Sequence, residues 1–217
     1  MKCFAGIDHI FFDFDGTLCD TAGDIMDSWR AAFAELKLDV PHFEQVYHVG
    51  PPTETAARVI FPDADDEFIR RVCRVYRQSY YNSTYPKSLA YPGVDAMLAK
   101  LKQEGKTLFV ATNKNGEPLG RLIDKLGWGE FFTEQLNRDM LPPGPIRKSL
   151  LLRRTLEKYR LDPRRSAMVG DAAADIAAGK EATVVTVAVT YGYGTPEELA
   201  ASGADWMLSL EEVRDYL

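Results

Sequence analysis

The sequence predicts an α/β fold in which a Rossmann-like, doubly wound parallel sheet is interrupted by an inserted α-helical domain. From residue 89 onward, short apolar runs alternate with segments of helical periodicity, which is typical of parallel strands joined by crossover helices. Before that, from about residue 20, only helical periodicity occurs. We therefore expect a core formed by residues 1–18 and 89–217, and a helical domain formed by residues 19–88.

The first predicted element is a buried strand, because Ile10-Phe11-Phe12-Asp13-Phe14 is a short apolar run that ends at acidic residues and a glycine. This strand would place Asp13 at its carboxyl end. The helical insert follows, and prolines separate its segments. Its apolar residues recur at helical spacing, first at Ile25, Trp29, Ala32, Phe33 and Leu36, and again at Phe68, Val72, Val75 and Tyr76.

The second part of the chain is predicted to alternate between helices and strands. Gly105 and Gly127 follow two of the helices as C′ glycines. The predicted helices are 94–104, 119–126, 148–159, 175–180 and 196–202, and the predicted strands are 107–111, 167–169, 184–189 and 206–208. One further strand is expected between Phe131 and Pro145, at a position that the pattern does not define.

Composition excludes several classes of protein. Hydrophobic residues make up 46% of the chain and charged residues 27%, as in ordinary globular proteins, and no apolar run approaches the roughly 20 residues that span a bilayer. The net charge of −6 argues against a nucleic-acid partner, which usually requires a concentrated basic surface. The N-terminus is a poor signal peptide, and the three cysteines are scattered. We expect a cytoplasmic monomer or homodimer with no membrane partner.

Candidate catalytic residues lie where predicted strands end, which is where open α/β sheets bind their ligands. Asp13 and Asp15 are two residues apart, and Gly16 allows a sharp turn after them. Two close carboxylates repel each other, which favours a bound cation or a proton held by one of them. The alternative is an ordinary acidic turn, since Asp and Gly are common turn residues.

Three further groups follow the same logic. Asp171 ends another predicted strand and Asp175 lies one helical turn later, although the pair could also be a helix cap and an exposed acid. Thr112 and Asn113 end the strand at 107–111, where a hydroxyl and backbone N–H groups could hold a phosphate, or could simply form a polar loop. Lys148 follows the Pro- and Gly-rich run from Leu141 to Pro145, where a lysine could offset phosphate charge, although a lone lysine is usually a solvated surface residue.

Taken together and in this order, the groups resemble the four motifs of haloacid dehalogenase superfamily phosphatases, over nearly the whole chain. The helical insert resembles a cap domain of that family in the first cap position. The runs Ala111-Thr112-Asn113-Lys114 and Tyr191-Gly192-Tyr193-Gly194-Thr195-Pro196-Glu197-Glu198-Leu199 look most like the phosphoglycolate phosphatase branch.

The resemblance implies a role for each candidate. Asp13 would attack phosphorus to form an aspartyl-phosphate, and Asp15 would protonate the leaving alcohol and then activate water. Mg²⁺ would be held by the Asp13 carboxylate, the Asp15 main-chain carbonyl and the Asp171 carboxylate. Asp175 would orient that site or pair with Lys148. The phosphoryl oxygens would be held by Thr112, the N–H of Asn113, and Lys148.

Two positions depart from the family pattern. Ser149 follows Lys148 where the family often has proline, and Arg147 beside it is a competing phosphate ligand; Ala172 stands where Ser or Thr is common. The best substrate hypothesis is 2-phosphoglycolate, with pyrophosphate, nucleoside monophosphates and sugar phosphates as alternatives.

Other activities are also open. A phosphosugar mutase of the same fold and a non-catalytic phospholigand-binding protein are the rival functions. The corresponding mutase loop often carries an arginine, and the run from His48 to Thr53 has none. A dehalogenase would lack the second aspartate, so Asp15 argues against that activity.

Overall fold

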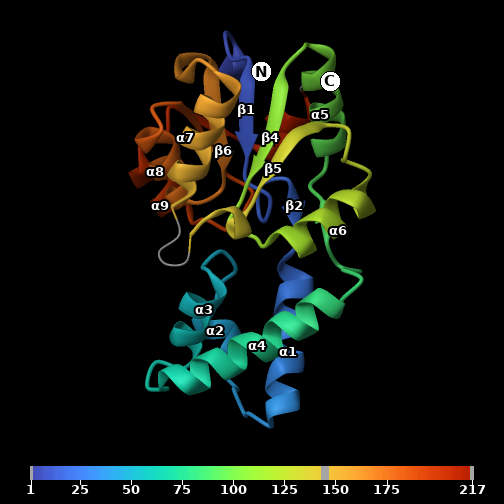
Figure 1. Ribbon diagram of the computed structural model, residues 1–217, viewed down its shortest axis with the longest axis vertical. Coiled ribbons are helices and arrows are strands. Elements are labelled where there is room, and N and C mark those ends of the chain that lie inside the picture. Colours follow the sequence, from blue (N-terminus) through green and yellow to red (C-terminus); the bar gives the residue numbers. More distant parts are fainter. Residues whose placement is uncertain (1, 143–146, 216–217) are drawn as a thin grey trace. The chain divides into compact units, whose positions relative to one another are not determined.

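The computed structural model describes residues 2–142 and 147–215, and six parallel strands form its main sheet (Figure 1). Residues 143–146, which include the end of the Pro- and Gly-rich run, lie outside the described residues. In sheet order the strands are β5 (Phe132–Leu136), β4 (Thr107–Ala111), β1 (His9–Phe12), β6 (Ser166–Gly170), β7 (Val185–Val189) and β8 (Trp206–Leu208). The predicted doubly wound α/β fold is confirmed.

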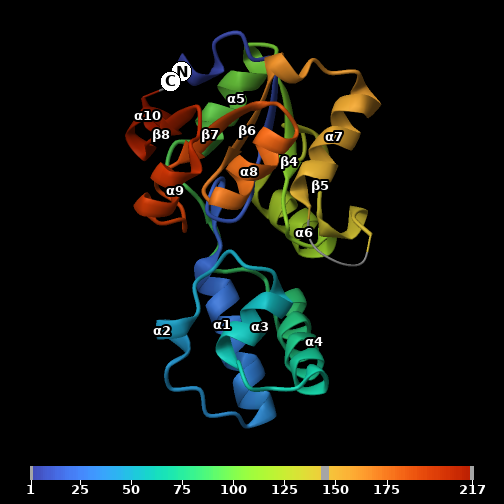
Figure 2. The same ribbon diagram turned by 90° about the vertical axis from the view of Figure 1, so that its left-hand side faces the viewer.

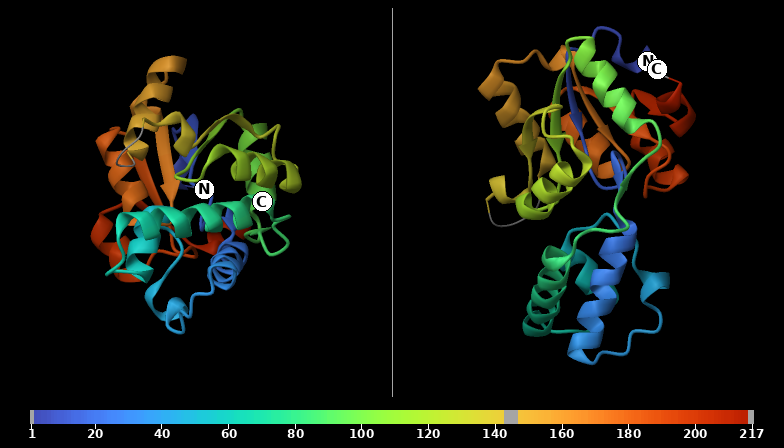
Figure 3. Two further views of the ribbon diagram at one scale, coloured as in Figure 1. Left: turned by 60° about the horizontal axis from the view of Figure 1, so that its bottom comes forward. Right: turned by 90° about the vertical axis from the view of Figure 1, so that its right-hand side faces the viewer.

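The sheet is covered by helices on both faces, which is why its central strands are apolar on both sides. In Figure 2 α8 lies in front of the sheet, and in the opposite view of Figure 3, right, α5 does. Ile10, Phe11 and Phe12 of β1 are fully buried, and Phe11 stacks on its β4 partner Phe109 with ring centroids 4.8 Å apart. The core helices are α5 (Val94–Gln103), α6 (Gly116–Leu126), α7 (Lys148–Tyr159), α8 (Ala173–Glu181), α9 (Pro196–Ser202) and α10 (Leu210–Arg214).

Short elements complete the core. The 3₁₀ helices are η1 (Lys2–Phe4), η2 (Arg138–Met140) and η3 (Pro163–Arg165). A two-stranded antiparallel sheet pairs β2 (Cys19–Asp20) with β3 (Leu89–Ala90), so that Asp20 lies opposite Leu89. This small sheet was not predicted, because two residues per strand are too few to show a periodicity of two.

The inserted segment is helical, as predicted, and consists of α1 (Ala22–Leu36), α2 (Phe43–Val46), α3 (Thr53–Ile60) and α4 (Asp66–Asn82). The long helices α1 and α4 lie side by side (Figures 1 and 3), and Trp29 of α1 stacks on Tyr76 of α4 with centroids 4.2 Å apart. The buried Asp24 carboxylate accepts hydrogen bonds from the Lys87 backbone N–H (3.1 Å) and the Ser88 hydroxyl (2.6 Å). These bonds tie the end of the insert to the start of its first helix.

The chain divides into two compact units, one formed by residues up to Asp20 together with those from Leu89 onward, the other by Thr21–Ser88. Within the described ranges, no helix combines the length and the apolar character needed to cross a bilayer. The three cysteines are buried and form no disulfide.

Candidate active site

Three neighbouring strands end at the same edge of the sheet and place the candidate residues there. Asp13 follows β1, Thr112 follows β4 and Asp171 follows β6, with β1 between the other two. The Asp13 backbone N–H donates to the Val169 carbonyl at 2.8 Å, which continues the pairing of β1 with β6 just past the end of the strand. Because carboxyl ends of parallel strands share one edge, residues about 160 positions apart in sequence meet here.

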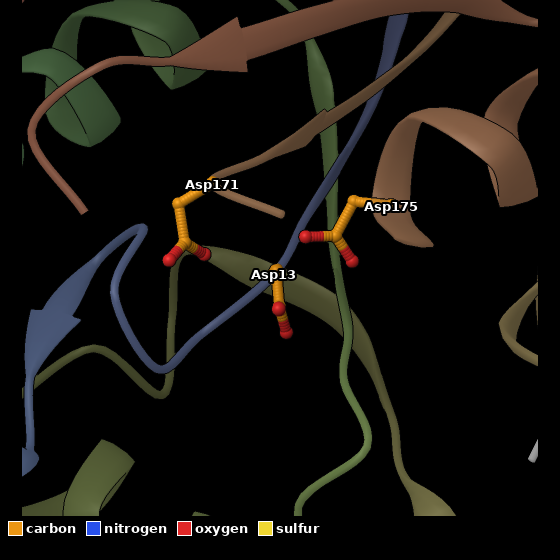
Figure 4. Close-up of side chains that lie close together, drawn as sticks. All are labelled: Asp13, Asp171 and Asp175. Atoms are coloured by element: carbon orange, nitrogen blue, oxygen red, sulfur yellow. The ribbon is translucent and has the colours of Figure 1, made fainter. Parts of the chain in front are cut away.

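Figure 4 shows three carboxylates gathered at this edge: Asp13 after β1, Asp171 after β6 and Asp175 in the first turn of α8. One oxygen atom of each lies within 4.8 Å of those of the other two. Burial raises the pKa of both Asp13 and Asp171 to about 6, and burial also raises the pKa of Asp175. The site therefore disfavours three uncompensated negative charges.

Lys148 supplies positive charge beside this cluster. Its Nζ lies 3.0 Å from Asp13 Oδ2 and also contacts Asp175 Oδ1, and its side chain is only 4% exposed. Burial alone would lower the pKa of Lys148, but attraction by Asp13 and Asp175 outweighs burial and raises it. Arg147, the alternative phosphate ligand, is exposed. Of these two residues, Lys148 is the one whose side chain reaches Asp13.

Asp15, which lies beyond the end of β1 at Phe12, contacts a different lysine. Lys114 Nζ lies 2.8 Å from Asp15 Oδ1 and 3.0 Å from Oδ2. The Lys114 side chain is 4% exposed and that of Asp15 is 21% exposed. Lys114 belongs to the run that ends β4, and the sequence pattern predicts no role for it. Its position next to Thr112 and Asn113 at a strand end was the available signal.

Asp171 is held by two segments that sequence reasoning left without a role. The Thr17 hydroxyl donates to Asp171 Oδ1 at 2.9 Å, and the Tyr193 backbone N–H donates to Oδ2 at 2.8 Å. Glycines permit this close approach: a Cβ at Gly192 would lie 2.3 Å from Asp171 Cβ, and one at Gly16 would lie 2.2 Å from Asp171 Oδ2. Gly16 also has a φ of +81°, in the left-handed region that favours glycine.

Thr112 and Asn113 lie at the end of β4, as predicted. Thr112 is 2% exposed, and its hydroxyl oxygen accepts a hydrogen bond from the Lys114 backbone N–H at 3.3 Å. The Asn113 side-chain oxygen is buried and has no hydrogen-bond partner among the described residues. A buried polar atom without a hydrogen-bond partner destabilises the fold unless a ligand or water supplies the missing hydrogen bond.

The donor set fits a hard divalent cation. Carboxylate oxygens are the ligands that Mg²⁺ prefers, and a cation would favour the ionised forms of Asp13 and Asp171, which burial and, to a smaller extent, repulsion by neighbouring carboxylates disfavour. The oxygens of Asp175 already accept from Lys148 and, at 3.2 Å, from the Ala172 backbone N–H. Asp175 is therefore a residue that holds Lys148 in place.

Comparison with known proteins shows the family of this chain. Residues 10–189 match the family described as haloacid dehalogenase-like hydrolase. The phosphoglycolate phosphatase of Neisseria meningitidis is 34% identical, over 98% of this chain and 96% of that protein. The phosphoglycolate phosphatase of Vibrio vulnificus is 29% identical, over 96% of this chain and 95% of that protein.

Solved structures show the same fold. A structure described as a predicted phosphoglycolate phosphatase from Haemophilus somnus has a TM-score of 0.85 at 24% identity, over 97% of this chain and 96% of that chain. A predicted phosphatase from Clostridium acetobutylicum has a TM-score of 0.82 at 25% identity, over 97% of each chain. The chain belongs to the haloacid dehalogenase-like hydrolases, and within them it is a phosphatase of the phosphoglycolate phosphatase-like branch.

Proposed function

We propose that this phosphatase hydrolyses small phosphate monoesters in a magnesium-dependent reaction that passes through an aspartyl-phosphate on Asp13. One observation carries the proposal. Asp13 stands at the end of the central strand β1, with Lys148 Nζ 3.0 Å away and with oxygens of Asp171 and Asp175 within 4.8 Å of its own. A nucleophilic carboxylate beside a buried cation and further oxygen ligands suits phosphoryl transfer, in which positioning and charge supply most of the rate.

Asp13 and Asp15 would divide the chemistry. An oxygen of Asp13 forms a bond to phosphorus while the bond from phosphorus to the leaving oxygen breaks, and Asp15 gives that oxygen its proton. Asp15 then takes a proton from water, whose oxygen attacks phosphorus and releases Asp13 and inorganic phosphate. Lys148, the Thr112 hydroxyl and the Asn113 backbone N–H hold the phosphoryl oxygens.

The metal ligands in this proposal are the Asp13 carboxylate, the Asp15 main-chain carbonyl and the Asp171 carboxylate. When bound there, Mg²⁺ neutralises phosphate charge and orients the ester. Thr17 and the Tyr193 N–H keep Asp171 in place, and Asp175 keeps Lys148 directed at Asp13. Each of these contacts acts before substrate arrives, so the site is organised in advance.

We propose 2-phosphoglycolate as the substrate, because similar proteins of 29–34% identity carry the name phosphoglycolate phosphatase. We also propose that the protein acts in the cytoplasm. The helical segment, residues 19–88, is proposed to act as a cap domain that contributes to substrate choice.

A panel of phosphate esters tests the substrate, compared by kcat/KM because that ratio reports transition-state binding. We expect 2-phosphoglycolate to rank above sugar phosphates, nucleoside monophosphates and pyrophosphate, EDTA to abolish turnover and Mg²⁺ to restore it. Full activity in EDTA would remove the metal from the proposal.

The role of Asp15 has its own test. A poor alkoxide leaving group needs a proton, whereas p-nitrophenolate is a stable anion, and general acid help is worth typically 10²–10⁴-fold. Asp15→Asn should therefore slow aspartyl-phosphate formation from an alkyl phosphate far more than from p-nitrophenyl phosphate. Rapid-quench measurement of the first turnover isolates this step. Equal slowing for both esters would mean that Asp15 is not the acid.

A further inference from the structure

The site contains a second buried lysine that the proposed phosphate chemistry does not use. Lys148 contacts Asp13, the proposed nucleophile, and Asp175. Lys114 instead contacts Asp15, with both carboxylate oxygens within 3.0 Å of its Nζ. Both lysine side chains are only 4% exposed, so neither is a solvated surface charge. The two ammonium groups thus occupy different parts of the site.

Lys114 is held in place along its length. Its backbone carbonyl accepts a hydrogen bond from the Arg138 N–H at 2.9 Å, and its backbone N–H donates to the Thr112 hydroxyl at 3.3 Å. At the other end, Nζ lies over the Phe14 ring, 6.0 Å from its centroid, as well as against Asp15. A flexible lysine fixed in this way acts as a positioned charge.

The contact with Asp15 determines which part of a substrate would meet Lys114. In the proposed reaction Asp15 protonates the leaving oxygen, so an ammonium group in contact with Asp15 lies on the leaving-group side. In 2-phosphoglycolate a carboxylate carbon is two bonds from the leaving oxygen. An ammonium carries three N–H donors, which suffices to bind a second carboxylate while it keeps a hydrogen bond to Asp15.

We propose that Lys114 is a specificity-determining residue that binds an anionic group on the leaving alcohol, namely the carboxylate of a phosphorylated hydroxy acid such as 2-phosphoglycolate. This inference rests on the proposed function, since it uses Asp15 as the acid. A buried ammonium suits the task because a charge pair is stronger where water is largely excluded. It also disfavours leaving alcohols that carry a positive charge.

The test compares two esters that differ in charge at one end, 2-phosphoglycolate and 2-hydroxyethyl phosphate. For the wild-type enzyme, kcat/KM should favour 2-phosphoglycolate. In Lys114→Met this preference should fall roughly ten- to hundredfold, the value of a hydrogen bond to a charged group. Lys114→Arg should retain most of it. Lys158→Met is the matched control, because Lys158 is exposed and pairs with Glu134; its preference should equal that of the wild type.

A binding measurement on the wild type does not depend on the variants folding. Glycolate should inhibit p-nitrophenyl phosphate turnover competitively, at concentrations where uncharged ethylene glycol does not. Lys114→Gln, which keeps a polar group without the charge, should lose this inhibition and keep inhibition by inorganic phosphate.

Four results would overturn the inference. Equal loss for both esters in Lys114→Met would show that Lys114 acts only by positioning Asp15. Equal inhibition by glycolate and ethylene glycol would show that no carboxylate is bound on the leaving-group side. A wild-type enzyme that hydrolyses p-nitrophenyl phosphate but not 2-phosphoglycolate refutes the role of Lys114 and leaves the aspartyl-phosphate mechanism standing, whereas failure to hydrolyse any ester refutes both.

Discussion

Four carboxylates and two ammonium groups meet at one edge of the sheet. Because most of these groups are buried, the loss of one contact should cost more stability than it would at the surface. Asp13, Asp171 and Asp175 sit where their charged forms are disfavoured, and Lys148 compensates only part of that cost. Ion pairs exposed to water contribute little to protein stability, but removal of one partner from a buried pair destabilises the protein by about 3–5 kcal/mol. Single substitutions at this edge should therefore reduce turnover or stability more than surface substitutions do.

The nucleophile gives the first prediction. Asp13→Asn keeps the shape of the side chain but removes the attacking oxygen's charge, so kcat should fall below about 1% of the wild-type value. Circular dichroism should show an unchanged fold. Asp63→Asn, at an exposed aspartate, is the control and should retain full activity. Retention of substantial turnover in Asp13→Asn, with contaminating phosphatase excluded, would remove Asp13 from the role.

Adjacent cations give the second prediction, because Lys148 is buried against Asp13 and Arg147 beside it is exposed. Lys148→Met should reduce kcat/KM at least about 100-fold and lower the free energy of unfolding by about 3–5 kcal/mol, since two carboxylates lose their partner. Arg147→Met should change both quantities little. Steady-state kinetics and urea denaturation measure the pair, and a larger kinetic loss in Arg147→Met would reverse the assignment.

Among the elements, the segment after β7 most directly positions a predicted metal ligand. Its Tyr193 N–H donates to Asp171, and Gly192 lets the backbone pass within van der Waals distance of the same residue. No side chain of this segment was a candidate ligand, and yet its backbone determines where a predicted metal ligand lies. Alteration of a group that hydrogen-bonds to a metal ligand typically changes metal affinity by 10–100-fold.

Gly192→Ala tests this role. The added Cβ would meet Asp171 Cβ and the Gly16 carbonyl oxygen at 2.3 Å, so that one of the segments must move. We expect at least tenfold weaker Mg²⁺ affinity, measured by the Mg²⁺ concentration that restores half-maximal activity. Gly120→Ala is the control, because a Cβ at Gly120 in α6 meets nothing within 4 Å; it should leave Mg²⁺ affinity unchanged and stabilise the helix by about 1 kcal/mol.

Elements with strong periodicity could be predicted from the sequence, and the rest depended on tertiary structure. The bounds of β4, α7, α9 and β8 agree with the predicted ones, since each combines a clear apolar pattern with nearby turn or capping residues. β5 could not be placed, because this edge strand reads Phe-Thr-Glu-Gln-Leu and buries only its ends. The pairing of Lys114 with Asp15 joins residues 99 positions apart, so no local pattern could reveal it.

At the scale of the whole molecule, the buried carboxylates link stability to pH and to metal. The pKa of Asp13 and of Asp171 is raised from 3.8 to about 6 in the folded protein. A raised pKa contributes stability that is fully present below the unfolded-state pKa and is lost as pH rises through the folded-state pKa. Without a divalent cation, stability contributed by these groups should therefore decrease between about pH 4 and pH 6.

Mg²⁺ should reverse that loss, because it binds ionised carboxylates and competes with protons. We expect Mg²⁺ to raise Tm clearly at pH 7.5 and little at pH 5, as measured by differential scanning calorimetry at constant ionic strength. Asp171→Asn should abolish most of the Mg²⁺-dependent shift at pH 7.5. A shift in Tm that is equal at both pH values would contradict carboxylate ligation.

The pairing of Asp20 with Leu89 predicts that the helical insert can be removed without unfolding the core. The chain departs from the core and re-enters it through adjacent positions of the small β2–β3 sheet, so the residues that flank the insert are already paired with each other. Replacing Thr21–Ser88 with Asn-Gly would turn β2 and β3 into a two-residue hairpin, a connection that these residues favour. The shortened chain should still fold and retain Mg²⁺-dependent stability, and a lineage could exchange one insert for another without rebuilding the sheet that carries Asp13.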